Sequence, residues 1–232
     1  MSEDKEIFWL HIKKNAGSSV RNILRPVYSE DERFHCPQCF IMAEKKYWND
    51  ILNNYKTPLG TYQFKRMLFA RDFLYSPQEF DRLFKFAISR NPIDRSKSMF
   101  FYLFKRQINK KYFFTTSKAL PNLFSNFLDC IEESRISLSN ANPHGIHFQT
   151  HTAEMHPDIS DEYGKPLINK IWRSDRLTKF ISEIEEIAGF KAGKNLPHIN
   201  KSQKNNFNLN NSHLNKLYDL YGNDFDIYEN AS

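Results

Sequence analysis

Basic and hydroxyl side chains gather in a short polar stretch near the start of the chain. An apolar run over residues 7–12 is typical of a β-strand, and Ser18–Leu24 can continue as a helix that Pro26 ends. A strand that turns directly into a helix leaves N–H groups unpaired at the helix start, and Gly17 permits close approach of the backbone to a ligand there. Ammonium and hydroxyl groups beside such amides favour a phosphate or sulfate. The stretch therefore predicts an anion site that includes Lys13, Lys14, Ser18 and Ser19.

The same stretch departs from the P-loop signature of ATPases, G-x-x-x-x-G-K-[ST]. It has neither the first glycine nor a lysine directly after Gly17, so plain ATP hydrolysis is disfavoured. Taken alone, the stretch also fits a buried first strand followed by a solvated pair of lysines.

A second strand, turn and helix lies in the middle of the chain and favours the anion site. Phe84–Ser89 is typical of a buried strand, Arg90 follows it directly, and Asp94–Ile108 has the pattern of a long helix. An arginine that ends a buried strand needs an anionic or carbonyl partner. Ser98 lies eight residues later, about two helical turns away, so Arg90 and Ser98 can converge on one phosphate.

The order of these elements predicts an α/β fold with a mainly parallel sheet flanked by helices, in which ligands gather at the carboxyl ends of the strands. We expect a third strand over residues 167–172 and a capping box at Ser76 and Glu79. Further helices are expected over residues 47–55, 120–131 and 177–187, the last closed by Gly189, and Ser212 is expected to cap the final helix. Residues 140–164 and 196–208 are predicted to be polar loops, and residues 61–73 suit a strand or a helix end.

The composition predicts one packed globular domain over residues 1–232, since 40% of the residues are hydrophobic and 15% are aromatic. A net charge of +6 favours anionic ligands without singling out nucleic acid. The sequence has no apolar stretch typical of a leader or of a membrane span, so the cytoplasm is the expected compartment. Cys36 and Cys39 lack a second pair of zinc ligands, and no metal site is predicted.

Four segments, in order along the chain, resemble motifs of the family 2 sulfotransferases, the carbohydrate sulfotransferase-like group. Residues 11–19 resemble the H-I-P-K-T-A-G-T-S loop, with Lys13 in place of its proline and Asn15 in place of its first threonine. Residues 86–98 resemble the segment F-x-x-x-R-N-P-x-D-R-x-x-S. Residues 196–202 resemble the late P-H-x-N-x-S loop, and residues 221–228 resemble the terminal Y-x-x-D-F signature.

The resemblance implies a P-loop-like three-layer fold that binds PAPS (3′-phosphoadenosine 5′-phosphosulfate) and releases PAP. The sulfuryl group would move to a hydroxyl of an acceptor, a saccharide or polysaccharide. Lys14 would hold the bridging oxygen as a catalytic residue, and Arg90 and Ser98 would bind the 3′-phosphate. The contacts implied for the cofactor are Lys13, Lys14, Asn15, Ala16, Gly17, Ser18, Ser19, Arg90, Ser98, Asn200 and Ser202. Asp94 and Arg95 could form a surface or capping pair, and we expect a structural role for both rather than direct catalysis.

A general base must accept the proton of the acceptor hydroxyl. Many related enzymes carry a Gly-His pair upstream of the second motif, but Gly60-Thr61 stands here. Residues 147–151 resemble an H-F-x-P-Q segment of the acceptor region, which makes His147 and His151 the catalytic candidates, with Asp72 as a carboxylate alternative. A group of loop histidines exposed to solvent is an equally open interpretation.

Three other functions stay open, and one of them is a catalytically inactive scaffold with the PAPS-binding fold, since the Gly-His pair is missing. A P-loop kinase-like phosphotransferase requires magnesium-dependent ATP binding, which the incomplete loop disfavours. A non-catalytic basic module that binds nucleic acid requires affinity that falls steeply with salt, and no recognised nucleic-acid motif supports it.

Overall fold

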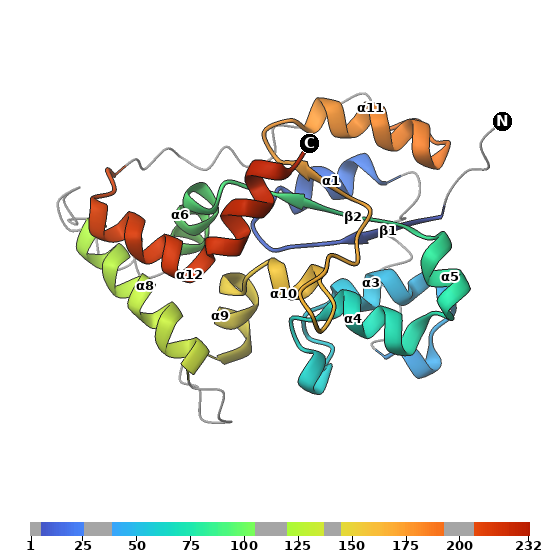
Figure 1. Cartoon of the computed structure of the whole chain (residues 1–232), viewed down its shortest axis with the longest axis horizontal. Coiled ribbons are helices and arrows are strands. Elements are labelled where there is room, and N and C mark those ends of the chain that lie inside the picture. Colours follow the sequence, from blue (N-terminus) through green and yellow to red (C-terminus); the bar gives the residue numbers. More distant parts are fainter. Residues whose placement is uncertain (1–5, 26–38, 105–119, 137–144, 193–206) are drawn as a thin grey trace.

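A parallel sheet of three strands, in the order β1-β2-β3, lies at the centre of the fold (Figure 1). The computed structural model describes residues 6–25, 39–104, 120–136, 145–192 and 207–232. The strands are β1 (Ile7–Leu10), β2 (Phe84–Ser89) and β3 (Lys170–Arg173), and both neighbouring pairs are parallel. Helices flank the sheet, which confirms the predicted α/β fold.

Alternating side chains of the strands bury both faces of the sheet. Trp9, Phe86 and Trp172 pack on one face beneath α1 (Gly17–Ile23) and α11 (Leu177–Ala188). Phe8, Leu10 and Ala87 pack on the other face. The helices on that second face are α3 (Trp48–Asn53), α4 (Arg66–Phe69), α5 (Pro77–Arg82) and α10 (His156–Ile159). The layers are therefore helix, sheet and helix.

A cluster of helices with an aromatic interior lies beyond the carboxyl ends of the strands (Figure 1). It consists of α6 (Pro92–Leu103), α8 (Leu120–Ile136), α9 (Gly145–Thr152) and α12 (Asn211–Asn230). Phe100 of α6 packs against Phe124 and Phe127 of α8, with ring centroids 5.5 and 5.6 Å apart. We call this group the helical cluster.

Most of the helix boundaries follow the sequence signals. Ser76 and Glu79 form the predicted capping box of α5, and Gly189 ends α11 with a φ of 66°. The predicted cap at Ser212 is wrong. Asn210 caps α12 instead, because its side chain accepts from the N–H of His213, whose ring accepts from the N–H of Asn210.

Two segments are more helical than the sequence suggests. Within residues 145–164 the predicted loop is wrong, since it contains α9 and α10. Burial explains the difference, because Phe148 packs against Phe127 of α8. Over residues 61–73 the chain forms no strand but continues from the 3₁₀ turn Gly60–Tyr62 through α4 into the π-helical Ala70–Leu74. Other short 3₁₀ turns are Phe40–Met42 and Lys45–Tyr47.

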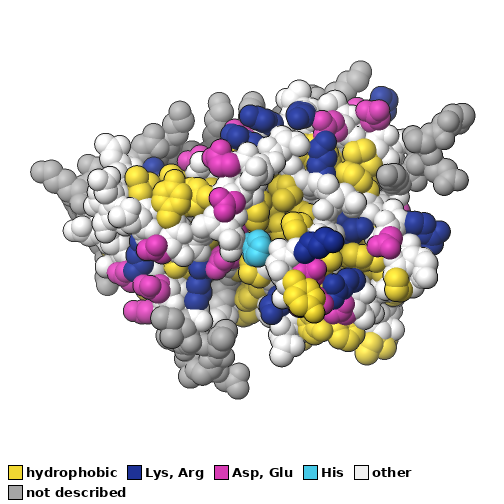
Figure 2. Space-filling model, viewed as in Figure 1, with side chains coloured by type: hydrophobic (Ala, Val, Ile, Leu, Met, Phe, Trp, Pro, Cys, Tyr) yellow, Lys and Arg dark blue, Asp and Glu magenta, His cyan; other side chains and the backbone are white. Residues whose placement is uncertain are grey.

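The surface carries charges of both signs. On the face in Figure 2, Lys and Arg side chains are interspersed with Asp and Glu side chains. The excess of positive charge therefore forms no broad basic area on this face. Among the described helices, none has the length and apolar character needed to cross a membrane.

Candidate functional site

The loop between β1 and α1 has a strained backbone. Lys14 and Ala16 have left-handed backbone angles, with φ of 67° and 57°, which are unfavourable for residues that carry a side chain. Ala16 precedes the first turn of α1, and no side chain caps that end of the helix. The first N–H groups of a helix largely lack partners within the helix. Here the N–H of Ser19 donates to the carbonyl oxygen of Ala16 at 2.9 Å, so the amides of Gly17 and Ser18 are left without a backbone partner among the described residues. A strained loop that leads into uncapped amides is typical of an anion-binding turn.

Guanidinium groups hold the carbonyl oxygens of this loop. Arg66 Nη2 donates to the oxygen of His11 at 3.2 Å, and Arg95 Nε donates to the oxygen of Lys13 at 3.2 Å. Arg90 Nη1 donates to the oxygen of Lys14 at 3.4 Å. Each of these oxygens would repel an anion, and each is directed at a guanidinium group instead. The contacts therefore favour a loop that presents positive rather than negative atoms to a ligand.

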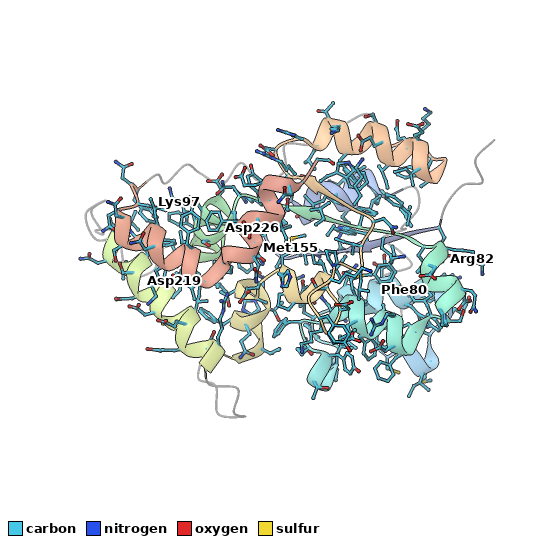
Figure 3. All side chains as sticks on the ribbon, viewed as in Figure 1. Phe80, Arg82, Lys97, Met155, Asp219 and Asp226 are labelled. Atoms are coloured by element: carbon cyan, nitrogen blue, oxygen red, sulfur yellow. The ribbon has the colours of Figure 1, made fainter. Side chains whose placement is uncertain are left out.

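Buried carboxylates hold two of these arginines. Arg66 pairs with Asp158 at 2.7 Å, and Arg95 pairs with Asp224 at 2.9 Å, with all four side chains at most 4% exposed. Asp224 also accepts from the N–H of Met155. Figure 3 shows Met155 at the place where α12, α10 and the sheet approach one another. Elements far apart in the sequence thus fix the loop through these two pairs.

Close packing within the loop requires Gly17. A Cβ atom on Gly17 would lie only 2.0 Å from Nε2 of His11. The His11 ring stacks on Trp9, with centroids 5.0 Å apart, so it has little room to move aside. Asn15 turns its side chain into the core, where Nδ2 donates to the carbonyl of Ile88 at 2.9 Å. Asn15 therefore shapes the loop by tying it to β2.

Three cationic side chains meet at the loop. Burial, together with the charges of Arg66 and Lys14, lowers the pKa of Lys13 to about 8. Burial and the charge of Arg90 lower the pKa of Lys14, and burial lowers the pKa of Arg90. Among the described residues, no carboxylate forms an ion pair with Lys13, Lys14 or Arg90. An anion would relieve the repulsion between these groups.

The hydroxyl groups predicted to bind the anion lie on two helices. Ser18 is exposed and Ser19 is half-buried in the first turn of α1. Ser98 is half-buried on α6, which begins two residues after Arg90.

A histidine pair on α9 lies next to the two lysines. The ring of His151 stacks on that of Tyr102, with centroids 4.7 Å apart, and Nζ of Lys14 lies 4.2 Å from the centroid of the same tyrosine ring. Burial, with smaller contributions from His147, Lys13 and Lys14, lowers the pKa of His151 to about 4. Nδ1 of His151 lies 2.8 Å from the carbonyl oxygen of His147. A carbonyl can only accept, so we assign the proton to Nδ1, which leaves Nε2 as the basic atom.

Residues 1–230 match the protein-family model of the sulfotransferase family, that of the family 2 sulfotransferases. The chain belongs to the sulfotransferase family. Comparisons with curated proteins and with solved structures gave no significant match. The match spans nearly the whole chain and confirms the resemblance found in the motifs. Sulfuryl transfer is the activity that the family supports.

Several of the predicted site residues of this sulfotransferase lie close together. Lys13 and Lys14 are in the loop, Arg90 contacts the loop backbone, and His151 joins them through Tyr102. Asp72 pairs with Arg71 at 2.8 Å and accepts from the hydroxyl of Tyr62, and neither of these partners belongs to the loop. The predicted contacts Asn200 and Ser202, and also Cys36, lie outside the described residues.

Sequence reasoning missed the residues that support the site. Arg95 has a structural role, as expected, but not at the surface, since it is 3% exposed and its carboxylate partner is Asp224 rather than Asp94. A signal was present, because both residues belong to the quoted motifs. Arg66 and Tyr55 were missed as well, although Tyr55 donates its hydroxyl to the carbonyl of His11 at 2.6 Å. No motif marks these two residues.

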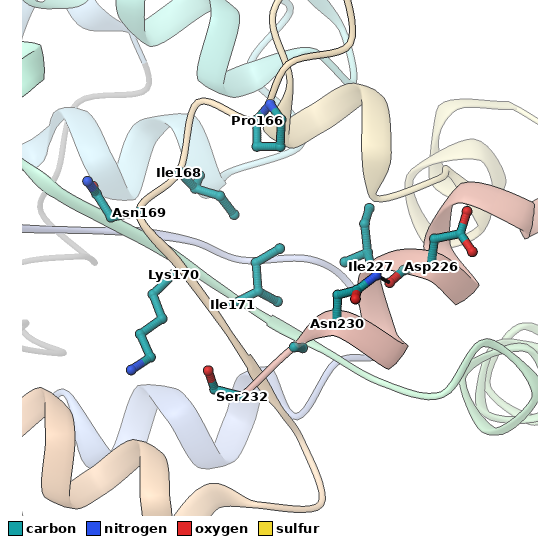
Figure 4. Close-up of a pocket in the computed structure, with 10 residues that line it drawn as sticks. Pro166, Ile168, Asn169, Lys170, Ile171, Asp226, Ile227, Asn230 and Ser232 are labelled. Carbon is teal, nitrogen blue, oxygen red and sulfur yellow. Dashed lines mark hydrogen bonds between the residues drawn. The ribbon is translucent and has the colours of Figure 1, made fainter.

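A separate cavity lies at the edge of β3, away from the loop (Figure 4). It measures about 430 Å³, and Ile168 and Ile171 line it together with Ile227 of α12. None of the predicted site residues contributes to it. Among the described residues there is also no group of three His, Cys, Asp or Glu side chains that could hold a metal ion.

Proposed function

We propose that this sulfotransferase uses PAPS as its donor and transfers the sulfuryl group to a hydroxyl of a saccharide. The observation that carries the proposal is the convergence of Lys13, Lys14 and Arg90 on a loop whose carbonyl oxygens are held by arginines. Within the described part of the chain these cations form no ion pair with a carboxylate, which fits a ligand with several phosphate and sulfate charges. The saccharide is inferred from the resemblance to the carbohydrate sulfotransferase-like group, since the motifs themselves say little about the acceptor.

The residues of the loop divide the donor between them. The ammonium of Lys14 would donate to the bridging oxygen and offset the charge that develops there. The amides of residues 16–19, with the hydroxyls of Ser18 and Ser19, would bind the 5′-phosphate. Arg90 and Ser98 would bind the 3′-phosphate, and we retain Asn200 and Ser202 as further contacts. When bound, PAPS supplies the sulfuryl group itself.

We propose His151 as the general base. Its Nε2 is the ring nitrogen left unprotonated by the bond of Nδ1 to His147, and its pKa of about 4 keeps the imidazole neutral at pH 7. Nε2 would accept the proton of the acceptor hydroxyl. The bound donor would bring negative charge to the lysines and so raise the pKa of His151 toward a more effective value. His147 would act by orienting His151 through its carbonyl.

Calorimetric titration with PAP, the desulfated product, tests the proposal, with magnesium ATP and AMP as comparators. We expect PAP to bind far more tightly than AMP, since only PAP carries a 3′-phosphate. Arg90→Ala should lose at least tenfold in PAP affinity, because a charge-assisted contact is removed. The matched control is Arg82→Ala, an exposed arginine at the end of α5 (Figure 3).

The other outcomes contradict the proposal in different ways. Preference for magnesium ATP over PAP would favour the kinase-like function. Absence of nucleotide binding, with affinity for RNA or DNA that falls steeply with salt, would favour the nucleic-acid module. A single domain over residues 1–232 and a cytoplasmic location remain part of our proposal.

A further inference from the structure

Tyr102 is an aromatic residue that neither the motifs nor the proposed mechanism assigns. It lies near the end of α6, and 47% of its surface is exposed. A single exposed aromatic side chain is not unusual in itself, so the contacts of the ring decide what it does. Within the described part of the chain, the ring contacts of Tyr102 are with the candidate site residues Lys14, His151 and His147.

The face of α6 on which Tyr102 lies is directed at the loop between β1 and α1, which we call the donor loop (residues 11–16). Arg95, Ser98 and Tyr102 are spaced three and four residues apart, so they share one side of the helix. Arg95 holds the carbonyl of Lys13, and Tyr102 contacts the ammonium of Lys14. One helix face thus reaches two successive residues of the loop.

The geometry of the ring suits both of its partners. Nζ of Lys14 lies 4.2 Å from the ring centroid, within the range of a cation–π contact. The ring of His151 lies 4.7 Å away at an interplanar angle of 25°, which is a stacked arrangement. The hydroxyl of Tyr102 has no hydrogen bond to any described residue. The contacts are therefore made by the ring.

We propose that Tyr102 is a positioning residue whose ring holds the Lys14 ammonium and the His151 imidazole at a fixed spacing. This inference rests on the proposed function, in which Lys14 contacts the donor and His151 contacts the acceptor hydroxyl. A fixed spacing between them aligns the donor with the acceptor before reaction.

The remaining surroundings of His151 are accounted for. Lys13 and Lys14 face it from the loop, Tyr102 faces it from α6, and His147 precedes it on α9. The helix α8 packs against α9 through other residues, since Phe127 contacts Phe148 and Gln149 donates to the carbonyl of Ser134. Of these neighbours, the ring of Tyr102 stacks most nearly parallel to the imidazole.

Two variants separate the ring from the hydroxyl. Tyr102→Phe keeps the aromatic face, whereas Tyr102→Leu keeps apolar bulk without it. Because the side chain is about half exposed, neither change is expected to prevent folding.

The first measurement is an NMR pH titration of the His151 ring in the donor-free protein, with the signal assigned from His151→Gln. We expect titration near pH 4 in the wild type and in Tyr102→Phe, and at least one pH unit higher in Tyr102→Leu, because the stacked ring contributes to the burial.

The second measurement is steady-state sulfuryl transfer. We expect Tyr102→Leu to lower kcat by about tenfold or more, with a change of less than threefold in PAP affinity, and Tyr102→Phe to keep most of the activity. Equal kcat and equal His151 titration in both variants would overturn the positioning role. A loss in Tyr102→Phe as large as that in Tyr102→Leu would assign the effect to the hydroxyl and also overturn it. A wild-type protein that does not bind PAP would overturn the proposed function first, which the titration in the same sample distinguishes from a failure at Tyr102.

Discussion

At the scale of single residues, the site is built from cationic side chains that repel one another when no anion is bound. Lys13 and Lys14 are adjacent, both are largely removed from water, and Arg90 adds a third charge. The aromatic rings of Tyr55 and Tyr102 lie beside the two ammonium groups at 4.5 and 4.2 Å and offset part of this cost. The free protein therefore holds a charge arrangement that an anionic donor would stabilise.

This arrangement makes PAP affinity depend on pH. The pKa of Lys13 is about 8 in the folded protein, below its ordinary value, so Lys13 loses its proton as the pH rises through 8. An anion favours the charged form, and PAP binding near pH 8 should therefore take up a proton. We expect PAP affinity to fall between pH 7 and pH 9.5, measured by calorimetry in buffers of different ionisation enthalpy.

The control for this prediction replaces the lysine. Lys13→Met should bind PAP more weakly at pH 7 and show a flatter dependence on pH, whereas Lys179→Met, an exposed lysine on α11, should behave as the wild type. Lys13→Met should also stabilise the donor-free protein at pH 7. The pKa of Lys13 is lower in the folded protein than in the unfolded protein. The free energy of unfolding is therefore highest above the unfolded pKa and decreases as the pH falls toward 8, so that at pH 7 Lys13 destabilises the donor-free protein. An affinity that is constant over this range would refute the role of Lys13.

At the scale of elements, α6 and α12 hold the donor loop although neither is next to it in the sequence. Arg95 of α6 donates to the carbonyls of Lys13 and Ala153 and pairs with Asp224 of α12. Both side chains of the pair are 4% exposed, so the partner of a missing charge would be left buried and unpaired. The pair therefore positions the loop and also links α6 to α12.

Arg95→Met should lower the free energy of unfolding by about 3–5 kcal/mol, measured by urea denaturation, because the carboxylate of Asp224 loses its partner in the interior. The matched control is Arg71→Met. Arg71 also forms two ion pairs, but they are on the surface, and the expected loss is below about 1 kcal/mol. Similar losses of unfolding free energy in the two variants would contradict the assignment of Arg95 and Asp224 as a buried ion pair that stabilises the fold.

The same elements show how far the sequence predicts the fold and the site. The three strands, the capping box of α5 and the end of α11 follow from local patterns of apolar residues, Ser, Pro and Gly. The helix α9 was missed because its eight residues have little helical periodicity and gain their stability from packing on α8. The partner of Arg95 was missed because Asp224 is 129 residues away. Local patterns carry no information about such contacts.

At the scale of the whole molecule, the site lies where the sheet layers meet the helical cluster. The loop follows β1, Arg90 follows β2, and Tyr102 and His151 belong to the helical cluster. A donor held by the loop, by Arg90 and by Ser98 of α6 would link the sheet layers to the helical cluster, whose hydrophobic cores are otherwise packed around separate residues. Donor binding should therefore stabilise both parts together.

Two spectroscopic signals can follow the two parts separately. The chain has three tryptophans, which are Trp9 in β1, Trp48 in α3 and Trp172 in β3. Tryptophan fluorescence therefore reports on the sheet and on the helical layer that contains α3. Far-UV circular dichroism also reports on the helical cluster. With PAP at 100 times its Kd, the free energy of unfolding should rise by about 2.7 kcal/mol, which corresponds to a Tm increase of roughly 5–10 °C. We expect both signals to shift equally in the wild type and in Arg82→Ala, and much less in Arg90→Ala. A shift of the fluorescence transition alone would mean that PAP contacts only the sheet side, and that Ser98 of α6 is not part of the donor site.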